Sequence, residues 1–203
     1  MKSVVAMVLA GVALGAAGAE RVVFEDPLKG KLADGWSWLR ENPKTWRIGE
    51  AGLEIRAEPG DANSVRNALL RPCPDRSKGK YAIELTVSNA TVPTNQYEQA
   101  GITLYSNDRP VFKFVKELVD GKLMMIPGRK LMDAQSVQLR LVILADSFIA
   151  MYRPDGKGQF LEAERGKLAA PGKDQVSIQC YHGPPGAEHW IRFSDFRIIE
   201  LTD

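Results

Sequence analysis

Hydrophobic and polar residues alternate with a period of two along most of the chain after residue 20. Residues 81–88 and 137–144 show the pattern most clearly, with Ile83 and Leu85 in the first apolar row and Leu139 and Leu141 in the second. A pleated strand sends successive side chains to opposite faces, so each run predicts a strand with one buried face. Weaker versions predict further strands at 22–25, 45–48, 53–57, 67–71, 98–105, 111–118, 122–126, 148–153, 175–182 and 189–200.

Turn residues separate these runs. They include Asn107-Asp108-Arg109-Pro110, Asp120-Gly121, Pro127-Gly128, Pro154-Asp155-Gly156 and Gly183-Pro184-Pro185-Gly186. No long amphipathic helix and no alternation of strands with helices interrupts the series. About a dozen short strands without helices predict an all-β domain, built as two packed antiparallel sheets or a closed barrel.

The N-terminus has the pattern of an export signal. Lys2 precedes an apolar run from Val4 to Leu14, and Ala17-Gly18-Ala19 offers the small residues that signal peptidase accepts. The apolar run is shorter than the roughly 20 residues of a spanning helix, which disfavours a membrane anchor. We therefore expect residues 1–19 to be removed, residues 20–203 to form one domain, and the protein to be periplasmic or secreted with no membrane attachment.

Composition narrows the class of partner. The 203 residues carry 27 basic and 25 acidic side chains, spread along the chain without a basic stripe or tail. This balance gives no reason to expect a nucleic-acid partner. The sequence leaves the oligomeric state open.

The chain has two cysteines, Cys73 and Cys180. Export permits a disulfide between them, but Cys180 alternates with Val176 and Ile178 as a buried free thiol in a strand would. The absence of a C-x-x-C spacing argues against both a redox site and a structural zinc site.

Several strings of residues resemble a known family. They are Gly35-Trp36-Ser37-Trp38-Leu39-Arg40-Glu41-Asn42-Pro43, Trp46-Arg47-Ile48, Gly52-Leu53-Glu54-Ile55, 96–105, Phe112-Lys113-Phe114-Val115-Lys116-Glu117, Gln138-Leu139-Arg140-Leu141 and Tyr152-Arg153-Pro154-Asp155-Gly156. Together they are similar to the concanavalin A-like domains at the C-terminus of β-xylosidases and in free-standing bacterial proteins. The resemblance implies a jelly-roll β-sandwich that often accompanies carbohydrate-active enzymes. The β-xylosidase domains follow a catalytic propeller, which this chain lacks, so a role in completing that enzyme's active site does not carry over.

The residues give their own reason to expect a sugar. If Ala100, Ile102 and Leu104 face the core, alternation sends their neighbours to a polar and aromatic face. A sugar needs a flat apolar platform and planar hydrogen-bonding groups. We predict that Trp36 or Trp38 supplies the platform, and that an oligo- or polysaccharide is the ligand, held by Gln99, Glu117 and Arg140. The predicted binding set is Trp36, Trp38, Arg40, Tyr97, Gln99, Lys113, Glu117 and Arg140.

Two other classes stay open. A glycoside hydrolase needs two carboxyl groups, for which Glu117 and Glu41 are the candidates, although the Glu-x-Asp-x-x-Glu arrangement of jelly-roll glucanases is absent. A structural or interaction protein would bury both Trp36 and Trp38 and pair Glu117 with Arg140 across neighbouring strands.

Metal sites have weaker support. His182 and His189 flank a turn. We expect them to form a solvated pair, and metal binding is the less favoured alternative. The sequence requires no cofactor. A structural calcium ion is a further candidate, because Glu25 and Asp26 near the first strand and Asp195 in the last can meet if those strands pair.

Overall fold

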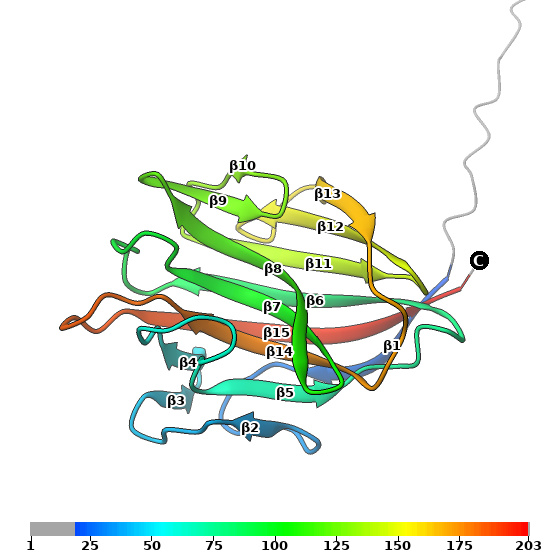
Figure 1. Cartoon of the computed structure of the whole chain (residues 1–203), viewed down its shortest axis with the longest axis horizontal. Helices are drawn as coiled ribbons and strands as arrows, with labels where there is room; N and C mark the ends of the chain where they lie inside the picture. The colour runs from blue at the N-terminus through cyan, green and yellow to red at the C-terminus, as the bar shows by residue number, and fades with distance from the viewer. Residues whose placement is uncertain (1–18, 203) are drawn as a thin grey trace, which may run out of the picture.

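The computed structural model describes residues 19–202, in which all regular elements are strands. The predicted export segment therefore lies outside the described residues, apart from Ala19. The strands form two antiparallel sheets packed face to face, which confirms the predicted β-sandwich (Figure 1). No helix in the described part of the chain is long and apolar enough to cross a membrane.

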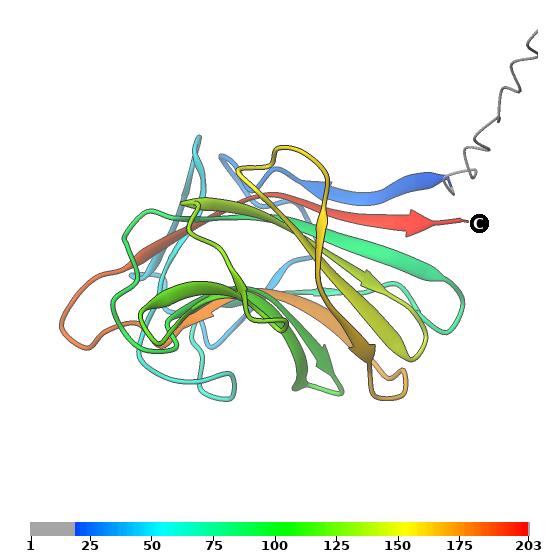
Figure 2. The same ribbon diagram turned by 90° about the horizontal axis from the view of Figure 1, so that it is seen from above.

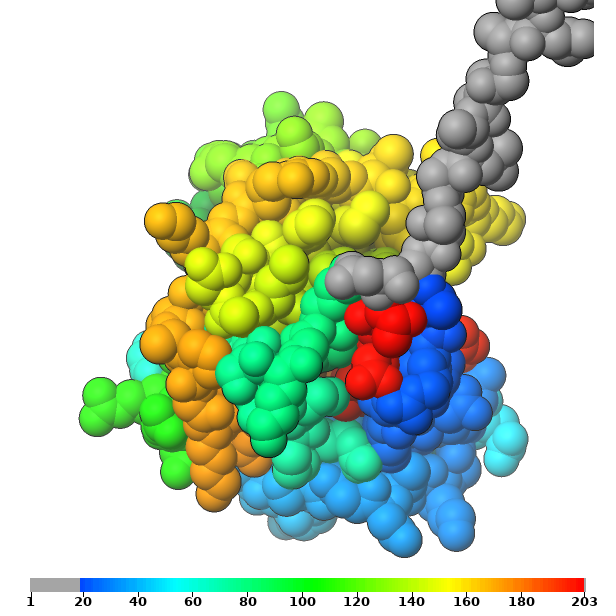
Figure 3. All heavy atoms as spheres, turned by 90° about the vertical axis from the view of Figure 1, so that its right-hand side faces the viewer, coloured from blue at the N-terminus to red at the C-terminus, as the bar shows by residue number. Residues whose placement is uncertain are grey.

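The first sheet, sheet A, has eight strands, and β15 lies near its middle. In spatial order they are β13 (Leu161–Lys167), β12 (Ser147–Pro154), β11 (Ser136–Ile143), β6 (Lys80–Asn89), β15 (Trp190–Leu201), β4 (Gly52–Arg56) and β3 (Trp46–Gly49), with β1 (Glu20–Asp26) also paired to β15. Glu20 pairs with Leu201, so the two ends of the described chain lie side by side (Figure 3).

The second sheet, sheet B, has seven strands. In spatial order they are β10 (Lys130–Leu131), β9 (Lys122–Ile126), β8 (Arg109–Val119), β7 (Gln99–Ser106), β14 (Asp174–Tyr181), β5 (Ala68–Pro72) and β2 (Ser37–Leu39). Figure 2 shows that sheet B is curved, with its hollow side facing away from sheet A.

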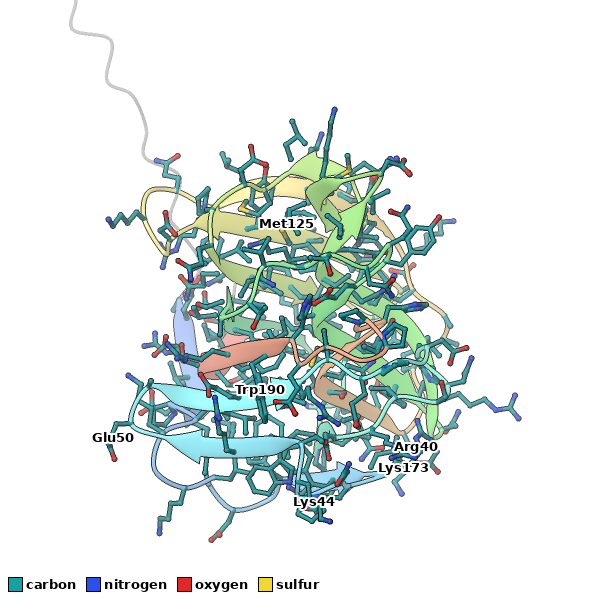
Figure 4. The ribbon with its side chains drawn as sticks, turned by 90° about the vertical axis from the view of Figure 1, so that its left-hand side faces the viewer. Arg40, Lys44, Glu50, Met125, Lys173 and Trp190 are labelled. Atoms are coloured by element: carbon teal, nitrogen blue, oxygen red, sulfur yellow. The ribbon has the colours of Figure 1, made fainter. Side chains whose placement is uncertain are left out.

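The core lies between the two sheets and is made by the alternating apolar rows. Leu139 and Leu141 of β11 and Ile83 and Leu85 of β6 are fully buried on sheet A, and Ile102 is fully buried on sheet B. Met125 of β9, labelled in Figure 4, is fully buried in this layer. Burial of apolar side chains on both inner faces is the main stabilising term of such a sandwich.

Three strands were not predicted. β2 and β10 contain only three and two residues, too few to show a period. β13 reads Leu-Glu-Ala-Glu-Arg-Gly-Lys, and Ala163 is its only buried residue. Charged residues are typical of an edge strand, because they discourage pairing with another chain.

One end of the sandwich is fastened by the buried side chain of Arg76. Its Nε donates to Asp174 Oδ2 at 2.7 Å, and its two terminal nitrogens donate to the carbonyl oxygens of Ala145 and Ala169. One guanidinium therefore joins the β5–β6 loop to three other segments.

We expect Arg76→Met to lower the free energy of unfolding by about 3 kcal/mol, because it leaves the Asp174 carboxylate without its buried partner. Urea unfolding measures the change. The control is Arg165→Met, which removes an exposed arginine paired with Glu162 and is expected to cost less than about 1 kcal/mol. Equal losses in the two variants would contradict the fastening role.

Lys116 is buried on the inner face of sheet B, and its Nζ donates to the carbonyl oxygens of Ala134 and Gln135. Burial lowers the pKa of this amine to about 8, although Asp155 and Asp133 oppose the shift.

This shift makes stability depend on pH. Between pH 8 and the ordinary lysine pKa of about 10.4, the unfolded chain holds a proton that the folded chain releases, so this group adds stability as pH rises. We expect the wild type to gain about 2–3 kcal/mol relative to Lys116→Met between pH 7 and pH 10. Urea unfolding of both proteins across this range measures the gain, and parallel pH profiles would contradict it.

Candidate functional site

The outer face of sheet B carries a compact array of polar side chains. Lys113 Nζ lies 2.7 Å from Gln99 Oε1 and 2.9 Å from Glu117 Oε2. Strand pairing brings the three together, because Gln99 of β7 lies opposite Glu117 of β8, and Lys113 is four residues from Glu117 on the same face. Gln99 and Glu117 are buried, whereas the Lys113 side chain is 35% exposed and can meet a ligand.

A second polar group lies beside this array, on β7 and β14. Gln179 Oε1 accepts hydrogen bonds from Tyr105 Oη at 3.1 Å and from Ser177 Oγ at 3.0 Å. Gln179 Nε2 and Thr103 Oγ1 are buried without a hydrogen-bond partner among the described residues. An unpartnered buried polar group is costly, which makes these two atoms unusual.

A pocket of about 460 Å³ opens on this face of sheet B. Its lining includes four polar residues, Asn63, Thr103, Lys113 and Tyr181. The rest of the lining is apolar and comprises Ala62, Pro110, Val111, Phe112, Ile126 and Pro127. The pocket thus combines an apolar wall with a few hydrogen-bonding groups, as ligand sites commonly do.

Residues 59–66, which we call the covering segment, lie over the neighbouring part of the same face. Val65 of this segment is buried in a cluster with Ala68, Leu70, Tyr105 and Tyr181. The outer face of sheet B is therefore open over β8 and β9 and closed over β14 and β5.

The phenols of this region stay neutral over the ordinary pH range. Burial raises the pKa of Tyr181, and the nearby Glu117 carboxylate raises it further. Burial also raises the pKa of Tyr105. Both phenols therefore act as hydrogen-bonding groups rather than as bases.

The indoles of Trp36 and Trp38, predicted to form a sugar platform, lie away from this face. Trp36 packs against Phe24 and Phe196, and its Nε1 donates to Asp26 Oδ2 at 2.8 Å. Trp38 is opposite Leu69 on the inner side of sheet B and stacks on Trp46 with ring centroids 4.7 Å apart. Both indoles support the core.

Arg140 is also separated from the array, which corrects the predicted grouping with Gln99 and Glu117. It lies on β11, on the outer face of sheet A, and makes ion pairs with Glu84 and Glu20. Its expected pairing with Glu117 is absent because the two residues belong to different sheets.

Arg40 and Glu41 follow β2, at the far edge of sheet B from β8. Arg40 Nε donates to Val65 O of the covering segment at 2.7 Å, and Figure 4 shows Arg40 on the side of sheet B. Glu41 accepts a hydrogen bond from Trp46 Nε1. Three strands lie between β2 and β8, so Glu41 and Glu117 do not form a pair of neighbouring carboxylates.

The two histidines do not form a solvated pair. His189 is buried, and its Nδ1 lies 2.9 and 3.0 Å from the two carboxylate oxygens of Glu98. His182 instead lies beside the rings of Tyr181 and Tyr97. Tyr97 precedes β7 with a positive φ, so the strand alternation does not extend to it, and its side chain is exposed.

The acidic residues considered for calcium lie near one another, because Glu25, Asp26 and Asp195 line the same small pocket. The first and last strands pair, as expected, and place Asp26 opposite Phe196. However, Asp26 already accepts hydrogen bonds from Leu28 N, Ala33 N and Trp36 Nε1. Within residues 19–202 no group of three or more His, Cys, Asp or Glu side chains is arranged to hold a metal ion.

The cysteines are both free. Cys180 Sγ is 3.6 Å from Ile55 O in the core. Burial raises the pKa of the Cys73 thiol to about 12, which keeps it protonated.

The residues that the sequence prediction left out lie mainly on β14. Ser177, Gln179 and Tyr181 alternate with Val176, Ile178 and Cys180. The same alternation that marked Cys180 as inward-facing could have marked these three as facing outward.

Comparison with solved structures identifies the class of fold. No family model matches the chain, and no curated protein matches it in sequence. The structure is similar to the GH43 protein BlXynB from Bacillus licheniformis, with a TM-score of 0.66 and 20% identity over 86% of this chain and 39% of that one. It is also similar to xylan beta-1,4-xylosidase from Bacillus halodurans C-125, with a TM-score of 0.60 and 13% identity over 88% of this chain and 39% of that one.

An alginate lyase from Klebsiella pneumoniae has the same sandwich, with a TM-score of 0.56 and 11% identity over 78% of this chain and 85% of that one. The chain thus shares a two-sheet β-sandwich fold with these proteins. It spans about two fifths of the length of the first two.

The position of Trp38 yields a prediction. We expect Trp38→Ala to lower the free energy of unfolding by about 2–3 kcal/mol, because it removes the stack on Trp46. Any affinity of the wild type for saccharides is expected to stay within twofold in the folded variant. Urea unfolding and calorimetric titration measure the two quantities. If Trp38→Ala lost saccharide affinity but kept the stability of the wild type, Trp38 would be a sugar platform as the sequence predicted.

Proposed function

We propose that the protein binds carbohydrate in the pocket on the outer face of sheet B and makes no covalent bond to it. The array of Gln99, Lys113 and Glu117 beside the pocket is the observation that carries this proposal. Its ammonium, amide and carboxylate groups offer both donors and acceptors, which suits sugar hydroxyls because each hydroxyl also does both.

The shape and lining of the pocket support the same ligand class. A volume of about 460 Å³ is within the usual range for small-ligand sites. Ile126 and Pro127 provide apolar surface for the C–H groups of a sugar ring, while Lys113 and Thr103 meet its hydroxyls. The Lys113–Glu117 ion pair leaves the array without net charge, which favours an uncharged sugar.

The proteins that share the fold add support, because several of them act on polysaccharides by name. They include the xylan beta-1,4-xylosidase and the alginate lyase described above. We further propose that the protein is exported, on the pattern of residues 1–19, and meets its glycan in the periplasm or outside the cell.

Binding is favoured over hydrolysis by the arrangement of carboxylates. Glycoside hydrolysis usually uses two carboxyl groups about 5–10 Å apart. Glu117 is held by Lys113, and Glu41 lies beyond three intervening strands. The arrangement therefore lacks the acid and base pair that the hydrolase alternative requires from these two residues.

The test is calorimetric titration of residues 20–203 with neutral oligosaccharides chosen from a glycan array. We expect Lys113→Met to weaken binding at least tenfold, because it removes a charged donor and frees Glu117 from its partner. Product release is measured in parallel as new reducing ends.

The matched control is Lys44→Met, which removes an exposed lysine in the turn between β2 and β3 (Figure 4). Equal affinities for wild type and Lys113→Met would reject the pocket as the site. If wild type releases new reducing ends and Glu117→Gln does not, the protein is a hydrolase and the proposal of binding without catalysis is wrong.

A further inference from the structure

Several buried polar side chains lie on the outer face of sheet B beneath the covering segment, next to the proposed binding pocket. Tyr105, Ser177 and Gln179 are buried there, and Gln179 Nε2 has no hydrogen-bond partner in the part of the chain that the structure describes. Thr103, whose Oγ1 is also unpartnered, belongs both to this group and to the lining of the open pocket. The two regions are therefore continuous along the outer face of sheet B.

The covering segment is fixed at its ends and weakly held between them. At one end Glu58 makes a bridge with Tyr181 and accepts from Arg56 Nη2, and at the other Asn67 Nδ2 donates to Thr45 Oγ1. Between these anchors, the hydrogen bond from Arg40 Nε to Val65 O is the only one that the structure shows from residues 59–66 to the rest of the described chain.

The tip of the covering segment keeps its shape by internal bonds. Asp61 Oδ1 accepts from Asn63 N, Ser64 N and Ser64 Oγ, and Asp61 N donates to Ser64 Oγ. The turn therefore does not depend on the sheet beneath it. Lifting it requires breaking the hydrogen bond to Arg40 and separating Val65 and Ala62 from the cluster on the sheet, without breaking a strand pairing.

We propose that the covering segment closes a second saccharide subsite, formed by Thr103, Tyr105, Ser177 and Gln179, which an extended neutral polysaccharide opens. This inference rests on the proposed carbohydrate binding. It further specifies that the ligand is an extended saccharide without charge. The four side chains of the subsite offer hydroxyl and amide groups, which fit sugar hydroxyls. Arg40 is the charged group that acts on Tyr105, and its Nε is already bonded to Val65 O, so a buried uronate would lose hydration without gaining a free opposite charge.

The experiment compares a neutral disaccharide with the hexasaccharide of the same series, using wild type and Arg40→Met. Arg40→Met removes the Arg40–Val65 hydrogen bond, so the free energy needed to lift the covering segment falls by the contribution of about one hydrogen bond. We expect hexasaccharide affinity to rise about three- to tenfold and disaccharide affinity to stay within twofold. In the double variant Arg40→Met/Gln179→Leu, we expect the gain in hexasaccharide affinity to disappear while disaccharide affinity stays unchanged.

The matched control is Arg66→Met, which removes an exposed arginine from the covering segment without removing its hydrogen bond to Arg40. A hexauronate should gain nothing from Arg40→Met. Thermal unfolding verifies that each variant is folded.

The outcomes separate the two proposals. If neither neutral sugar binds wild type, the proposed function fails. If the disaccharide binds but Arg40→Met changes both affinities equally or changes neither, the pocket stands and the closed subsite is rejected. A gain for the hexauronate equal to that for the neutral hexasaccharide would overturn the preference for neutral sugars.

Discussion

The burial of β7 on both of its faces is the constraint on which the rest of the structure depends. Its inner side chains, including Ile102, join the core between the sheets, whereas Gln99, Thr103 and Tyr105 point to the outer face and are still shielded from solvent. Gly101 is required between them, because a Cβ at this position would lie 2.5 Å from Phe114 O. A strand that is dry on both sides needs partners for its polar side chains. Gln99 and Tyr105 have them, whereas Thr103 Oγ1 has none among the described residues.

The distribution of charge explains why the outer faces of the two sheets differ. On sheet A the charged side chains are largely neutralised by one another, as in the groups formed by Arg140 with Glu84 and by Arg192 with Glu54. On sheet B the Lys113–Glu117 pair is beside a pocket, and Gln179 beneath the covering segment has a free donor. The outer face of sheet B therefore has unused hydrogen-bonding capacity next to an accessible space, which is the basis of the proposed sugar site.

Other connections between strands are fastened by buried side chains that reach several segments at once. Arg76 joins four segments at one end of the sandwich, and Asp26 holds the turn after β1 together with the indole of Trp36. The covering segment differs, because within residues 19–202 its one hydrogen bond to another segment is the bond from Arg40 to Val65 O. Lifting the covering segment would open the outer cluster around Val65 but leave the core between the two sheets intact, which connects the packing of the fold to the proposed ligand length.

The sequence by itself determined the strands with a strong period, such as β6, β7 and β11, the faces their residues occupy, and hence the two-sheet class. It could not show β2, β10 or β13, which are too short or too charged to carry a period. Within the site, Lys113 and Glu117 could be placed together because they share one strand. The tertiary structure alone decided that Arg140 belongs to the other sheet, that Trp38 stacks on Trp46, and that His189 meets Glu98 from 91 residues away. The physical reason is that alternation is a local property of the chain, whereas the neighbours of a strand depend on contacts between residues far apart in sequence.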